Sequence, residues 1–131
     1  GMFTSRRGLG VPKNKYMDYA NEDSLIIVII EDLKAISNLD EIIKVENIDV
    51  FFVAPNDLAQ SMGIANSKSK DKLNQEIYKA VQKIQEANRK VGTLANSNNI
   101  DSYIEMGIDL LLYDTNQFVK DGITDLKNKI K

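Results

Sequence analysis

The chain of 131 residues contains no cysteine, no histidine and no tryptophan, and only two prolines. Without cysteine it can form neither a disulfide framework nor a thiolate zinc site. Without histidine, acid-base catalysis and metal ligation by imidazole are excluded as well. Any catalysis by this chain must therefore use carboxylates, amines, hydroxyls, backbone groups or a metal ion held by oxygen.

The charge balance and the apolar runs exclude further classes of protein. The 17 basic and 19 acidic side chains give a formal charge of −2, without the basic stripe that a general nucleic-acid binder carries. The longest unbroken apolar run, Leu25–Ile30, is far too short to span a membrane. No charged-then-apolar leader begins the chain. We therefore expect a cytoplasmic protein that binds neither nucleic acid nor a membrane.

Apolar, β-branched runs alternate with stretches of helical spacing along the chain. We predict strands near residues 25–30, 50–54, 91–95 and 109–113. The first two runs lack clean alternation of polar and apolar residues, which is typical of parallel strands covered on both faces. Strands that alternate with helices predict right-handed βαβ crossovers, and therefore an α/β fold with a parallel sheet.

The helices are expected where apolar residues recur every three or four positions. Four such stripes are present, at Leu33–Ile43, Leu73–Ala87, Ile100–Ile104 and Val119–Ile130. Asn88 suits the left-handed conformation that ends a helix, and Gly107 stops the third stripe. We expect polar loops over residues 1–23 and over Asn66–Asp71. No second domain is visible, so residues 1–131 are expected to form a single domain.

Two acidic side chains follow the first two predicted strands. Glu31 comes directly after Leu25–Ile30, and Asp57 follows Val50–Val53 across a short turn. The carboxyl ends of parallel strands meet at one edge of a sheet, where ligands bind. Two carboxylates there would suit a hard cation such as Mg²⁺ or Mn²⁺. The alternative is structural, since Asp57 could cap the following helical turn and Glu31 or Asp32 could cap the next helix.

The sequence resembles the HpcH/HpaI aldolases, also called citrate-lyase-β-like aldolases, over nearly its whole length. Its residues Arg7-Gly8-Leu9-Gly10 resemble an Arg-Gly-x-Gly loop of that family, and Ile29-Ile30-Glu31 resembles its Gln-Ile-Glu. The most specific block is Ile48-Asp49-Val50-Phe51-Phe52-Val53-Ala54-Pro55-Asn56-Asp57-Leu58-Ala59, which matches the family's Ile-Asp-x-x-Phe-Ile-Gly-Pro-x-Asp-Leu-Ser. These enzymes use a metal to cleave 4-hydroxy-2-oxo acids to pyruvate and an aldehyde.

The resemblance implies roles for several residues. Glu31 and Asp57 would be the two protein ligands of a divalent metal, Mg²⁺ or Mn²⁺, which would act as a Lewis acid on the bound 2-oxo acid. The segment Ala54–Asp57, and in particular Ala54, Pro55 and Asp57, would line the pocket for an oxo acid such as pyruvate.

The family forms a (β/α)8 barrel, and this chain matches only strands five to eight of it. The missing half carries the family's base histidine and its carboxylate-binding arginine, so we expect no catalytic residue in this chain. Ile29 stands where the family has Gln, and Ala54 where it has Gly.

Three functions remain open for such a half-barrel. A partner chain that supplies strands one to four could complete an aldolase site. The chain could instead be a degenerate or truncated aldolase without catalysis, or a module that only self-associates. Four strands leave two unpaired edges that must be covered, so a homo-oligomer or a partner chain is expected in every case, and the isolated chain should be inactive.

Overall fold

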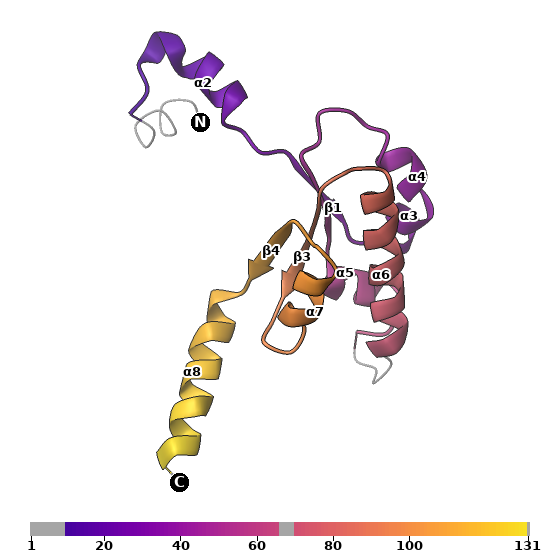
Figure 1. Cartoon of the computed structure of the whole chain (residues 1–131), viewed down its shortest axis with the longest axis vertical. Coiled ribbons are helices and arrows are strands. Elements are labelled where there is room, and N and C mark those ends of the chain that lie inside the picture. The colour runs from indigo at the N-terminus through magenta and orange to yellow at the C-terminus, as the bar shows by residue number, and fades with distance from the viewer. Residues whose placement is uncertain (1–9, 66–69, 131) are drawn as a thin grey trace.

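The computed structural model describes residues 10–65 and 70–130, and in this part four strands form one parallel sheet (Figure 1). The strands are β1 (Ile27–Ile30), β2 (Val50–Val53), β3 (Val91–Ala95) and β4 (Leu110–Tyr113), in the order β1-β2-β3-β4. All three pairings are parallel, so the predicted α/β architecture is confirmed.

The bounds of β3 are those predicted, and those of the other strands differ from the prediction by one or two residues, most clearly at the start of β1. Ile26 lies outside the strand because its N–H group donates to the side chain of Asp49 at 2.7 Å. Its carbonyl oxygen accepts from the Asp49 N–H at 2.9 Å. The same carbonyl oxygen also accepts from the Val50 N–H group at 3.2 Å, so only the N–H group of Ile26 is bound by the loop before β2 alone.

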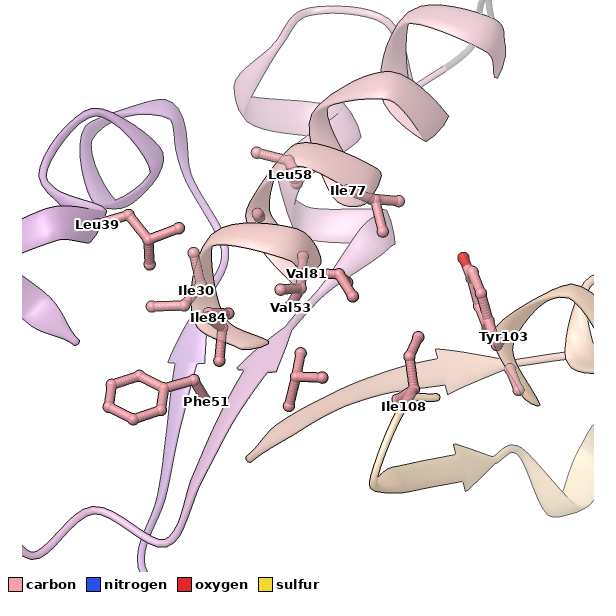
Figure 2. Close-up of a cluster of buried hydrophobic side chains, with 13 residues drawn as sticks. Ile30, Leu39, Phe51, Val53, Leu58, Ile77, Val81, Ile84, Tyr103 and Ile108 are labelled. Atoms are coloured by element: carbon pink, nitrogen blue, oxygen red, sulfur yellow. The ribbon is translucent and has the colours of Figure 1, made fainter. Parts of the chain in front are cut away.

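One face of the sheet is covered by helices, and the main hydrophobic core lies between this face and the helices (Figure 2). The longest covering helix is α6 (Lys70–Glu86), with α5 (Pro55–Ser61), α7 (Ile100–Glu105) and two short helices, α3 (Leu33–Ser37) and α4 (Leu39–Ile42). The fully buried side chains of this layer include Phe51 and Val53 from β2 and Ile77, Val81 and Ile84 from α6. The predicted stripe from Leu73 to Ile84 is therefore the core face of α6, whereas Ala87, its last predicted member, follows the helix and is exposed.

The other face of the sheet is apolar as well, but no helix of the hydrophobic core packs on it. The register places Ile29, Phe52 and Gly92 side by side on this face. At its margins Ile29 is 57% exposed and Leu112 is 47% exposed. We call this the open face; its members are Ile27, Ile29, Val50, Phe52, Gly92, Leu94, Leu110 and Leu112.

Two helices stand apart from the sheet at the ends of the chain (Figure 1). The helix α2 (Tyr16–Glu22), preceded by the short 3-10 helix η1 (Lys13–Lys15), comes before β1, and α8 (Thr115–Ile130) follows β4. Neither α2 nor α8 has a buried side chain. Among the described helices none is both long and apolar enough to cross a bilayer.

Three sequence-based expectations about local structure need correction. Residues 1–23 were expected to form a loop, yet their described part contains η1 and α2; local helix formers such as Met17 and Ala20 account for a helix without buried contacts. The stripe Leu33–Ile43 is not one helix, because the backbone turns at Asn38 (φ −100°, ψ 10°) between α3 and α4. Of the loop predicted over Asn66–Asp71, residues 66–69 lie outside the described part, and the remaining two residues begin α6.

The predicted helix ends are confirmed. Asn88 has a φ of 55° just after α6, and Gly107 has a φ of 70° just after α7. Positive φ values are those that asparagine and glycine tolerate best, which is why these residues end the helices.

Candidate functional site

The loops that carry Glu31 and Asp57 leave the sheet side by side. Ile30 and Val53 are register partners at the ends of β1 and β2. The N–H group of the next residue, Ala54, donates to the carbonyl oxygen of Ile30 at 3.0 Å. Glu31 therefore follows β1 directly at the level where β2 passes into α5, and Asp57 lies in the first turn of that helix. The structure brings these two segments together at the carboxyl edge of the sheet, as the sequence predicts.

Two hydrogen bonds hold the loop after β1. Asp32 caps α3, because its Oδ1 accepts from the Ala35 N–H group at 2.6 Å. The Leu33 N–H group donates to Ser61 Oγ at 3.0 Å, which ties the start of α3 to the end of α5. The capping role considered for Glu31 or Asp32 thus belongs to Asp32. The helix α5 has no side-chain cap, so capping does not explain Asp57.

Both Glu31 and Asp57 are exposed, and neither takes part in an ion pair between described residues. The described residues contain no group of three or more histidine, cysteine, aspartate or glutamate side chains that could hold a metal ion. Two free carboxylates offer oxygen ligands of the kind that Mg²⁺ and Mn²⁺ prefer. These ions usually keep several waters or take further ligands from a substrate.

The turn between β2 and α5 is closely packed. Ala54 is buried, its N–H group binds Ile30, and its carbonyl oxygen accepts from the Leu58 N–H group at 3.0 Å. Pro55 has no N–H group and is half-buried at the first position of α5. The donors left in this turn are the N–H groups of Asn56 and Asp57, since the first turn of a helix lacks intrahelical acceptors for them.

A pocket of about 390 Å³ begins at the same edge but opens on the helical side. Its lining includes Pro55 and Asn56 from the β2–α5 turn, Asn96 and Asn99 after β3, and Tyr103 of α7. Neither Glu31 nor Asp57 lines it. Tyr103 is buried, and this burial raises the pKa of its hydroxyl. Sequence reasoning overlooked Asn96, although it follows β3 directly, as Glu31 follows β1.

Comparison with known proteins identifies the family to which the chain belongs. The family described as HpcH/HpaI aldolase/citrate lyase matches the chain over residues 3–120. A 4-hydroxy-2-oxo-heptane-1,7-dioate aldolase of Shigella sonnei (strain Ss046) is 34% identical over 93 residues, which are 70% of this chain and 36% of that protein. A 2-keto-3-deoxy-L-rhamnonate aldolase of Escherichia coli O6:K15:H31 is 29% identical over 106 residues, 75% of this chain and 40% of that protein.

A solved structure shares the fold. The crystal structure of an HpcH/HpaI aldolase/citrate lyase family protein from Burkholderia cenocepacia J2315 superimposes with a TM-score of 0.79 at 19% identity. The match covers 90% of this chain and 47% of that one. The chain thus spans less than half the length of these relatives, and the structural relatives are TIM-barrel aldolases, so its four strands correspond to half of a barrel.

Proposed function

Because the chain belongs to the HpcH/HpaI aldolase/citrate lyase family, we propose that it is the metal-binding half of a divalent-metal-dependent aldolase site for 4-hydroxy-2-oxo acids. The observation that carries this proposal is the pair of exposed carboxylates, Glu31 and Asp57, on loops that leave neighbouring parallel strands at one level. Ligand sites of β/α barrels lie at this edge of the sheet. A cytoplasmic location is part of the proposal.

Members of the family generally depend on a divalent metal. In this chain Glu31 and Asp57 would hold the ion, which supplies Lewis acidity when it is bound. Asp32 and Ser61 hold the loop of Glu31 against α5, so they keep the first carboxylate near the helix that carries the second. The Ala54–Pro55 turn would form the wall of the pocket for an oxo acid such as pyruvate, with the N–H groups of Asn56 and Asp57 as donors.

The chain supplies no imidazole base for the aldol step. It has no histidine, and its three arginines are Arg6, Arg7 and Arg89. Arg6 and Arg7 lie outside the described residues. Arg89 donates to the backbone carbonyls of Ile43 and Ile48 at 2.6 and 2.9 Å, so its guanidinium is already used in the fold. We therefore place the base and the carboxylate-binding group on a partner, which is either a chain that supplies strands one to four or another copy of this chain.

Isothermal titration with Mn²⁺ tests the metal site. The wild type should bind one ion per chain, and Asp57→Asn and Glu31→Gln should each weaken binding by at least about tenfold, since each removes a charged ligand. Glu86→Gln is the matched control, because Glu86 ends α6 and α6 leads to the opposite edge of the sheet. Equal heats from the wild type, Asp57→Asn and Glu31→Gln would show that these carboxylates are not ligands.

A second function is favoured by a separate observation. The two terminal helices bury no side chain, and the sheet has an open apolar face. A non-catalytic half-barrel that serves binding or self-association would have the same features. It differs from the first proposal in one measurable respect, because it predicts no specific metal binding at Glu31 and Asp57.

A further inference from the structure

We propose that the partner of this chain is a second copy of itself, and that two copies close one eight-stranded barrel in which β4 of each copy pairs in parallel with β1 of the other. The inference rests on the proposed function in one respect, since it names the partner that was left open there. The pairing itself requires neither a metal nor catalysis.

The first argument is the state of the two sheet edges. Within the described residues β1 is bonded only to β2, and β4 only to β3, so each has one unpaired side. All four strands run in the same direction. A β/α barrel closes with eight parallel strands. A second copy related by a twofold axis along the barrel supplies four strands in the required direction and satisfies both edges at once.

The second argument is the chemistry of the open face. Every one of its eight residues is apolar or glycine, so two such faces can enclose a common interior without burying an unpaired charge. At present Ile27, Ile29 and Leu112 are 38%, 57% and 47% exposed. Parallel sheets are normally covered on both faces. Because all four strands run in the same direction, the interior of a closed barrel is a form of cover available to this face.

The third argument comes from the C-terminal helix α8. In a β/α barrel each helix covers the groove between two adjacent strands. The helix α8 follows β4, so it stands at an edge where the second strand of its groove is absent (Figure 1). The joint between β4 of one copy and β1 of the other provides that strand. The apolar stripe of α8 is available for it, with Val119, Ile123, Leu126 and Ile130 all at least 49% exposed.

These three features favour one occupant. An unrelated protein could cover the open face, but it would not pair two parallel edges and complete the groove beside α8. A chain with strands one to four would pair the same edges, and it is the partner indicated if the purified chain stays a monomer. A homodimer needs no sequence other than this one, and it buries each feature with a feature of the same chain. It would also place two Glu31–Asp57 pairs around one barrel mouth.

The absence of cysteine makes the pairing directly testable, because any introduced thiol is the only one in the chain. Four single variants are prepared, Ile27→Cys and Ile29→Cys in β1, and Leu110→Cys and Leu112→Cys in β4. Each β1 variant is mixed with each β4 variant, unfolded, refolded together and mildly oxidised. Scanning four combinations allows for the unknown register of the joint. Circular dichroism of each variant checks that it folds.

The closed barrel predicts a mass by light scattering of twice the 14.7 kDa of one chain. It also predicts a disulfide-linked dimer in at least one mixture and none when a variant is oxidised alone, since identical positions lie on opposite sides of the barrel. A monodisperse monomer would overturn the proposal. So would disulfides that form within single variants, which indicate sheets stacked face to face, or a dimer in which no mixture forms a disulfide. The manganese titration is independent of these readouts, so failure of the metal site and failure of the pairing are distinguishable.

Discussion

Gly92 shows how one residue sets the packing of the open face. A Cβ atom at this position would lie 2.9 Å from Phe52 Cδ2, 3.1 Å from Val50 Cγ1 and 3.2 Å from Leu110 Cβ. The ring of Phe52 therefore packs directly over the glycine, which explains why Phe52 is only 8% exposed on a face that no helix covers.

We predict that Gly92→Ala destabilises the protein by about 1–2 kcal/mol, because an added methyl group in a filled space forces side chains from their rotamers. Gly122→Ala in α8 is the control. It meets no atom within 4 Å, and alanine in a helix interior should stabilise by about 0.5–1 kcal/mol. Urea unfolding of both variants checks the pair. A stable Gly92→Ala protein with an unchanged midpoint would show that Phe52 moves aside without cost.

Asp109 joins the starts of β3 and β4. Its carboxylate accepts from Lys90 Nζ at 2.7 Å and from the Val91 N–H group at 3.0 Å. Partial burial would raise the pKa of Asp109, but the bonds from Lys90 and from the Val91 backbone outweigh it and hold the pKa below the ordinary value of 3.8.

A lowered pKa in the folded state means that the Asp109 carboxylate stabilises the fold above the ordinary aspartate pKa, and that this stability is lost as the pH falls through the lower, folded-state value. We predict that Asp109→Asn makes the stability less dependent on pH below about pH 4. Lys90→Met should have the same effect to a smaller extent, since the Val91 bond remains. Urea midpoints measured from pH 6 to pH 2.5 test this. Identical slopes in all three proteins would contradict it.

At the scale of elements, periodicity predicted what depends on local pattern. The four strands, their parallel direction, α6 and the ends at Asn88 and Gly107 follow from residue spacing and backbone preference. The break at Asn38 did not, because an apolar stripe continues across it. Nor did α2, which is held by local propensity without a buried stripe.

The candidate site also has features that the local sequence pattern predicts and features that it does not. That Glu31 and Asp57 share an edge follows from strand direction, which alternation of elements fixes. The bond between Leu33 and Ser61 joins residues 28 positions apart, so it depends on how α3 and α5 pack. Arg89 follows α6 in the sequence, yet its guanidinium bonds carbonyl groups after α4 and lies 4.7 Å from the Phe51 ring centroid. Such long-range contacts cannot be predicted from the local spacing of residues.

The cap of α3 gives a prediction at this scale. Asp32→Ala removes the bond to the Ala35 N–H group, and loss of such a cap typically costs about 0.5–2 kcal/mol. Because the capped turn follows Glu31 directly, we also expect Asp32→Ala to weaken Mn²⁺ binding, and Asp32→Asn to retain most of both properties. Asp101→Ala in the first turn of α7 is the control, since the α7 cap residue is Asn99. Unchanged metal binding in a destabilised Asp32→Ala protein would show that the cap does not position Glu31.

At the scale of the whole molecule, closing the barrel and restoring catalysis are separate problems. In the proposed dimer a second copy of this chain supplies four strands and a groove for α8, but it brings no histidine, because the sequence has none. The relatives are more than twice as long as the segment that matches them, so more than half of their length has no counterpart in this chain.

We therefore predict that the purified chain, as a dimer and saturated with Mn²⁺, releases no measurable pyruvate from a 4-hydroxy-2-oxo acid. A positioned proton-transfer group typically contributes about 10²–10⁴-fold to the rate, and the missing carboxylate-binding group removes further substrate orientation. Lactate dehydrogenase with NADH reports pyruvate continuously, and a full-length relative is the positive control. Activity should rise above background only when a histidine-bearing chain with strands one to four is added. It should then be lost with Asp57→Asn, because that variant removes the metal ligand while leaving the partner unchanged. Rapid pyruvate release by the chain alone would show that a group other than imidazole serves as the base, and the acceptors to examine first would be the carboxylates at the same edge of the sheet.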